Sequence, residues 1–84
     1  MSDVEAMPNI GAVLAGRLRR VGITTETQLL TVGDAAAFRL LRADLPDDAC
    51  THTRLALAGA VRGVRWHSLD KSLRQRLTAQ AHRP

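Results

Sequence analysis

The stretch DDACTHTRLALAGAVRGVRWH, residues 47–67, decides the fold. Its larger apolar side chains recur at steps of seven, four and three residues, which places them on one face of a helix. We therefore predict that the longest helix of the chain begins at Asp47 or Asp48 and runs to Gly63. Its buried face is expected to consist of Cys50, Leu57, Val61 and Val64.

Two glycines lie inside this predicted helix, Gly59 and Gly63, with alanines at positions 56, 58 and 60 around them. A glycine in a helix interior costs about 1 kcal/mol relative to alanine. A helix tolerates that cost mainly where another backbone approaches closely, so both glycines are expected at close helix–helix contacts. The helix is therefore predicted to be central and crowded, with Trp66 beyond its end as a largely buried core anchor.

Four more helices are predicted, because Gly, Pro and Asp separate four other segments with apolar residues at helical spacing. The first runs from about 9 to 21, and the second from a Thr25–Gln28 capping box to Gly33. The third begins at Asp34 as an N-cap and ends before Pro46. The expected core residues are Ile10, Leu14, Leu18 and Val21; Leu29, Leu30 and Val32; Phe38 and Leu41; and Leu69, Leu73, Leu77 and Ala81. The prediction is an all-α fold, a compact bundle of about five short helices in one domain over residues 1–84, with its core between about 7 and 77.

The composition argues against a membrane-spanning protein and against a secreted, disulfide-bonded protein. The only aromatic residues besides histidine are Phe38 and Trp66, so the core must be mainly aliphatic. No apolar run approaches the roughly 20 residues of a membrane span. The first five residues are acidic where a signal peptide would be basic, and the single cysteine, Cys50, has no internal disulfide partner. We expect Cys50 to be a small core residue and the chain to be cytoplasmic, without contact with a membrane.

A search for catalytic or metal-binding patterns yields none. His52, His67 and His82 have neither the mutual spacing nor the second cysteine of a zinc site. His67, Ser68 and Asp70 are too close in sequence to point at one another as a catalytic triad requires. Neither a phosphate-binding P-loop nor a dinucleotide glycine motif is present. We therefore expect no enzyme activity, no cofactor and no small-molecule substrate.

Charge points toward an anionic partner. The chain carries 12 Lys and Arg against 8 Asp and Glu, and all but Lys71 of these cations are arginine. Arginine pairs bidentately with phosphate and carboxylate groups, which favours binding of such a partner. A GC-rich genome would also favour arginine codons, so the composition alone leaves both explanations open.

The segment from Met7 to Gly11 has the most specific local geometry. A Pro-x-aliphatic-Gly turn that leads into a helix leaves backbone N–H groups pointing outward at the positive end of the helix dipole, where anions bind. The segment is similar to the hairpin and second helix of helix-hairpin-helix DNA-binding motifs. It departs from them at Asn9, where the motif has its first glycine, and at Val13, where a lysine is frequent.

The candidate phosphate contacts follow from this turn. Arg17 and Arg20 flank one side of the helix and Arg19 faces nearly opposite. The alternative is a tight helix start in which Ile10 only plugs the core and the stem of Arg17 only covers apolar surface. The candidate DNA-phosphate site consists of Asn9, Ile10, Gly11, Arg17 and Arg20.

Over roughly residues 7–77 the chain resembles the C-terminal domain of the TfoX (Sxy) family of bacterial competence regulators. The resemblance rests most on Val61–His67, which is similar to a closing signature of the form G-(I/V)-R-W-H-x-L. It also rests on Pro8–Gly11, Ala15, Leu18, Gly22–Ile23 and Leu55–Ala60. It implies an all-helical fold and a positive regulatory role in natural transformation beside DNA-binding transcription factors. Full-length members carry a separate N-terminal domain that is absent here, so a stand-alone relative is expected.

Two functional hypotheses remain open. The first is a regulatory module that contacts duplex DNA through its phosphates. The second is a protein–protein adaptor, or a homo-oligomerisation domain, that docks a transcription factor or another protein without touching DNA. A shared basic face around the turn would favour the first, and an exposed apolar groove would favour the second.

Overall fold

The structure, a computed structural model, describes residues 2–83. Five α-helices are found there: α1 (Ala12–Arg20), α2 (Glu26–Val32), α3 (Asp34–Leu41), α4 (Cys50–Arg62) and α5 (Lys71–Ala81). Short 3-10 turns lie at Val4–Ala6, Arg42–Asp44, Asp47–Ala49 and Trp66–Ser68. The only β-type pairing in residues 2–83 is a single bridge between Asp3 and Thr25. The predicted all-α fold with five helices is confirmed.

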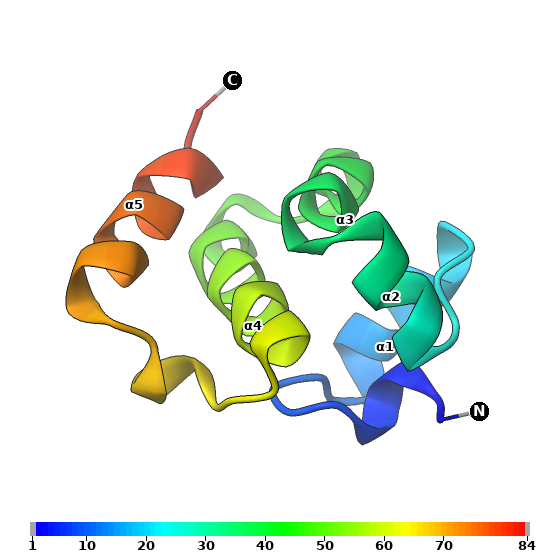
Figure 1. The fold of residues 1–84 in the computed structure, drawn as a ribbon. Helices are drawn as coiled ribbons and strands as arrows, with labels where there is room; N and C mark the ends of the chain where they lie inside the picture. Colours follow the sequence, from blue (N-terminus) through cyan, green and yellow to red (C-terminus); the bar gives the residue numbers. More distant parts are fainter. Residues whose placement is uncertain (1, 84) are drawn as a thin grey trace.

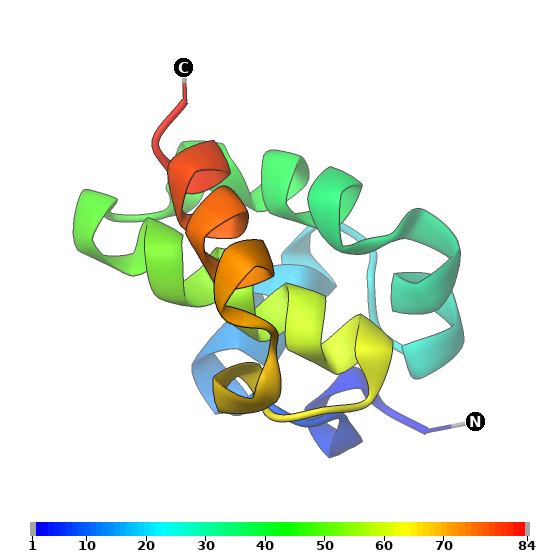
Figure 2. The ribbon, with the colours of Figure 1, turned by 60° about the vertical axis from the view of Figure 1, so that its left-hand side comes forward.

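Helix α4 is the centre of the fold, as predicted. In Figure 1 it lies between α5 on one side and α1 to α3 on the other, and Figure 2 shows α5 crossing it. Every residue from Thr53 to Ala60 is buried. A helix that is buried on all sides needs partners on all sides. Accordingly, Leu57 joins the main core while Leu55 joins a second cluster under α5.

The main core extends beyond the predicted limits of about 7 and 77. Val4 and Ala81 are both fully buried in it. Leu18 and Phe38 lie in the same cluster, as the helical spacing predicted. The second cluster contains Leu55, Ala58, Leu69 and Leu77, with Leu73 packed at its edge. The predicted burial of Cys50 is also confirmed.

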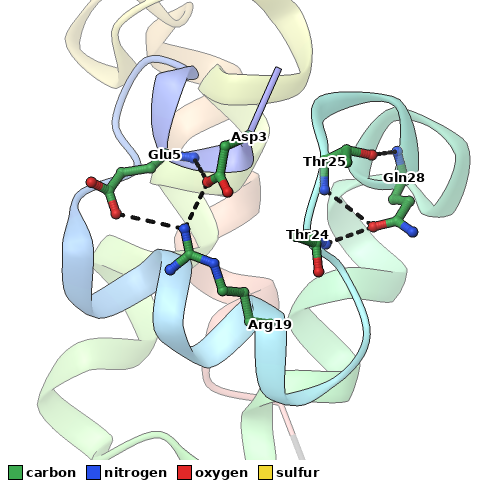
Figure 3. Close-up of polar contacts among 6 residues, drawn as sticks. All are labelled: Asp3, Glu5, Arg19, Thr24, Thr25 and Gln28. Atoms are coloured by element: carbon green, nitrogen blue, oxygen red, sulfur yellow. Dashed lines mark hydrogen bonds and ion pairs between the residues drawn. The ribbon is translucent and has the colours of Figure 1, made fainter. Parts of the chain in front are cut away.

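Of the two predictions for α2, the capping box is confirmed and the full set of buried residues is not. The capping box at the start of α2 is present: the N–H of Gln28 donates to Thr25 Oγ1 at 3.2 Å, and the N–H of Thr25 donates to Gln28 Oε1 at 3.1 Å (Figure 3). The predicted burial of Leu30 and Val32 was wrong, because these side chains are 53% and 38% exposed. A helix of only seven residues has one narrow buried stripe, and Leu29 fills it.

Two predicted helix boundaries were also wrong. Asp34 is not an N-cap: it is the first residue of α3, and the cap is Gly33 at φ 87°. Gly63 is not inside α4 but ends it in a left-handed conformation at φ 72°, a position that favours glycine. It is exposed and has no close neighbour that a side chain would meet, so the predicted helix–helix contact at Gly63 does not exist.

None of the helices within residues 2–83 combines the length and the apolar character that a bilayer crossing requires.

Candidate functional site

The turn before α1 contains the one residue other than glycine with a positive φ in residues 2–83. Asn9 adopts φ 71°, the left-handed conformation that asparagine tolerates better than other side-chain-bearing residues. Ile10 after it is only 5% exposed and fills the core. What precedes the turn is a single 3-10 turn, Val4–Ala6, and not the first helix of a helix-hairpin-helix. The likeness to that motif is therefore limited to the turn and the helix that follows it.

The first turn of α1 leaves its backbone donors open. Gly11 is the N-cap and offers no side chain to accept a hydrogen bond. The first helical hydrogen bond of α1 is made by Ala15, whose N–H donates to Gly11 O four residues earlier, at 2.9 Å. The N–H groups of residues 12–14 have no acceptor within residues 2–83. Gly11, Ala12 and Val13 are exposed, so these donors lie where an anion could reach them.

The side chain of Asn9 is fully occupied inside the protein. Its Nδ2 donates to Val64 O at 2.9 Å and to Ala56 O at 3.4 Å, and its Oδ1 accepts from the N–H of Trp66 at 3.0 Å. This ties the turn to the loop after α4, as the neighbouring blue and yellow segments of Figure 1 show. The side chain of Asn9 therefore holds the turn in place, and the contact of the turn's backbone N–H groups with a phosphate stays a prediction.

We call these hydrogen bonds of the Asn9 side chain to Ala56, Val64 and Trp66 the Asn9 tie. Gly59 leaves the space that this tie needs. A Cβ at Gly59 would lie 2.5 Å from Asn9 Nδ2 and 2.7 Å from Val64 O. The predicted close approach at Gly59 is confirmed, but what approaches is the side chain of Asn9 and the loop after α4, not a second helix. The glycine of the central helix and the asparagine of the turn therefore belong to one packing arrangement.

The three arginines of α1 differ in their surroundings. Arg19 Nη2 lies 2.8 Å from Asp3 Oδ1 and 3.8 Å from Glu5 Oε1 (Figure 3). The pKa of Asp3 lies below its usual value because the N–H of Glu5 and then Arg19 hydrogen-bond to its carboxylate. Arg17 and Arg20 have no ion-pair partner within residues 2–83. They share one helix face with Val13 at i, i+4 and i+7 spacing, whereas Arg19 faces away.

A groove of about 330 Å³ runs beside this face. One wall is formed by residues between Gly11 and Arg17, and the other by Ala49, which ends the 3-10 turn before α4, and by His52 and Thr53 of α4. The other lining residue is Asn9, and the residues with polar side chains are Asn9, Arg17, His52 and Thr53. The sequence did not indicate His52 as a site residue, since a lone histidine on an exposed helix face carries no signal of its own.

Trp66 is half-buried, so the prediction of a largely buried core anchor was wrong in degree. Its ring packs on the second cluster with Leu55. On its other sides it stacks on the ring of His67 at 3.9 Å between centroids and meets the ring of His52 edge-on at 5.7 Å. Trp66 therefore closes the second cluster instead of filling the main core.

These features define a class of small all-α domain, in which a tight turn before the first helix is fastened to the end of a buried central helix. The family model of the TfoX C-terminal domain matches residues 1–81, and the chain belongs to this family. The match is wider than the 7–77 over which the resemblance was recognised.

Two crystal structures of Listeria monocytogenes proteins are similar to this chain. One is an uncharacterized protein in a triclinic form, with 37% identity and a TM-score of 0.82 over 90% of this chain and 85% of that one. The other is a protein of unknown function in a tetragonal form, with 35% identity and a TM-score of 0.83 over 94% of this chain and 95% of that one. A comparison with curated proteins finds no match.

Proposed function

We propose that this domain is a non-enzymatic regulatory module that contacts the phosphates of duplex DNA through α1 without reading the bases. The observation that carries the proposal is the open N-terminus of α1 together with Arg17 and Arg20 in the last turn of the same helix, which have no acidic partner in residues 2–83. Backbone N–H groups and arginines are the groups that position proteins on DNA phosphates. The family resemblance supports a regulatory role in natural transformation.

Electrostatics confine the proposed contact to α1. The N-terminus of a helix carries roughly half a positive charge, so an anion is favoured at the first turn of α1, and the two arginines provide positive charge at the last turn of the same helix. On the far side of the groove, Ala49 is preceded by Asp47 and Asp48, so that rim is acidic. A DNA backbone would therefore lie along the Val13, Arg17 and Arg20 face and not bridge to the start of α4.

The test is binding of a fluorescently labelled duplex at low salt, measured by anisotropy. Gly11→Val should weaken binding, because its branched side chain would stand over the free N–H groups without changing the charge. The Cβ is tolerated by the fold, since nothing lies within 4 Å of it. Lys71→Ala/Arg76→Ala, which removes two exposed cations of α5, is the charge-matched control and should bind as wild type does. Wild-type protein that ignores duplex DNA at low salt would overturn the proposal.

A second candidate is a protein-docking or self-association surface at the same groove. Val13 is 69% exposed and stands in a largely apolar lining, which is typical of a contact surface. This candidate predicts self-association, or binding of a protein partner, that Val13→Ser weakens. Under the DNA proposal, the same substitution leaves binding almost unchanged. Analytical sedimentation of the wild-type and Val13→Ser proteins measures self-association, and the DNA titration of the same two proteins measures DNA binding. The two measurements together separate the two functions.

A further inference from the structure

A second basic region lies on the other side of the molecule. A cleft of about 400 Å³ opens between α3 and the C-terminal end of α5, with Arg54 of α4 between them (Figures 1 and 2). We call it the arginine cleft, because four arginines from three segments of the chain line it. Its principal lining residues are Phe38, Arg39, Arg42, Arg54, Gln80 and Arg83.

The floor of the arginine cleft is a fixed, buried guanidinium. Arg54 is 4% exposed, its Nη1 donates to Asp34 Oδ2 at 2.6 Å, and its Nη2 donates to Gln80 Oε1 at 3.3 Å. A buried charge is retained only when it is paired and hydrogen-bonded, and these two bonds meet that need. Because Gln80 accepts through its oxygen, its amide nitrogen remains a donor, and no acceptor for that nitrogen is found within residues 2–83.

Positive charge exceeds negative charge around this floor. Within residues 2–83, Asp34 is the one carboxylate that forms an ion pair with an arginine of the cleft. It pairs with Arg54 and, at 3.7 Å, also with Arg62. Arg39, Arg42 and Arg83 have no ion-pair partner in the same residues. The guanidinium carbon of Arg42 lies 6.0 Å from the centroid of the Phe38 ring, which restrains it at the cleft wall. Cations held together in a concave site concentrate anions there.

The arginine cleft is separate from the α1 face. His52 borders the α1 groove and Arg54 floors the cleft, and two residues along a helix turn the side chain by about 200°, to the opposite side of α4. A volume of about 400 Å³ is within the usual size of small-molecule sites. From the volume, the four arginines and the apolar Phe38 wall, we infer that the cleft binds a small phosphorylated molecule with two or more negative charges, of the nucleotide di- or triphosphate type.

The experiment is a titration of the isotope-labelled full chain, followed by NMR, with inorganic pyrophosphate, with ATP and with adenosine. Pyrophosphate and ATP should shift the signals of α3, Gln80 and Arg83, while adenosine should not. Shifts caused by pyrophosphate, which has no base, would show that the site recognises the phosphate groups. Tighter binding of ATP than of pyrophosphate would show that the apolar wall also contacts the base. Shifts by adenosine equal to those by ATP, or no shifts by either anion, would overturn the inference.

Variants locate the binding. Arg39→Gln/Arg83→Gln removes two exposed cations and should weaken pyrophosphate binding by about tenfold for each charge-assisted bond lost. Lys71→Gln/Arg76→Gln removes the same charge from two exposed positions of α5 outside the lining of the cleft and should leave pyrophosphate binding unchanged. Gln80→Glu keeps an oxygen for Arg54 but adds a negative charge, so it should weaken binding in a folded protein. Equal binding by Gln80→Glu and wild type would contradict the assignment, as would duplex DNA that reproduces the anion shifts.

Discussion

The backbone N–H of Trp66 donates a hydrogen bond to the side-chain oxygen of Asn9 at 3.0 Å, although the two residues are 57 positions apart in the sequence. The two most informative segments of the sequence, the turn before α1 and the signature after α4, are therefore one structural unit. The left-handed conformation of Asn9 directs its amide at the loop, and the missing side chain of Gly59 leaves space for it. The geometry of the α1 N-terminus depends on this tie.

Replacing Asn9 tests the tie. Asn9→Gly keeps the left-handed backbone and removes the side-chain hydrogen bonds, so it should lower the free energy of unfolding by about 1–3 kcal/mol. Asn9→Asp retains the acceptor for Trp66 but places oxygen against the carbonyls of Val64 and Ala56, and it should cost more than Asn9→Gly. Urea denaturation measures both. An Asn9→Asp protein as stable as wild type would show that the Nδ2 bonds contribute nothing.

Two helical glycines provide a matched pair. Gly59→Ala should destabilise by about 1–3 kcal/mol, because its Cβ collides with Asn9 and the Val64 carbonyl. Gly16→Ala, within α1 and with no atom within 4 Å of the new Cβ, should stabilise by about 0.5–1 kcal/mol through helix propensity. Thermal unfolding of the two variants should shift in opposite directions. Stabilisation by both would mean that the space at Gly59 is not needed by the tie.

The ion pair of Asp34 with Arg54 predicts a loss of stability in acid. Burial raises the pKa of Asp34, but the hydrogen bond and charge of Arg54 outweigh it, so the pKa lies below its usual 3.8. A carboxyl whose pKa is lowered by folding stabilises the protein above its unfolded pKa, and this contribution is lost as the pH falls through the folded value. Stability should therefore decrease below about pH 4.

Asp34→Asn tests this assignment. It should cost about 2–3 kcal/mol at neutral pH, below the 3–5 kcal/mol for breaking a fully buried pair, since Asp34 is partly exposed. The variant should also lose part of the decrease in stability below pH 4. Arg62→Ala removes the longer, exposed contact to Asp34 and should cost only about 0–1 kcal/mol. An acid dependence identical in Asp34→Asn and wild type would assign the titration to other carboxylates.

Sequence patterns predicted the helices well where the signal was local. The capping box of Thr25 and Gln28 is complete within four residues of sequence, whereas the predicted buried face of α4 was wrong at Val64, which lies beyond the end of the helix and is 36% exposed. The prediction was less successful where tertiary contacts decide. Asp34 was predicted to be an N-cap, but its carboxylate forms an ion pair with Arg54. Gly63 was predicted to lie at a helix–helix contact, but it ends α4 as the C-cap.

The candidate site was predictable only in part. The open turn at Gly11 and the shared face of Arg17 and Arg20 follow from spacing along one helix. The engagement of the Asn9 side chain and the convergence of Arg39, Arg54 and Arg83 bring together segments far apart in sequence. Such contacts depend on how the helices pack, which a single sequence does not encode in its local periodicity.

The salt dependence of duplex DNA binding tests the central claim most directly. Each neutralised phosphate contributes about −0.9 to the slope of log K against log salt concentration, so Arg17 and Arg20 together should contribute about −2. Arg17→Ala/Arg20→Ala should therefore flatten the slope by about two, with its circular dichroism spectrum unchanged. A wild-type protein that binds duplex DNA with the same slope as this variant, or that does not bind at low salt, would contradict the claim that α1 contacts DNA phosphates.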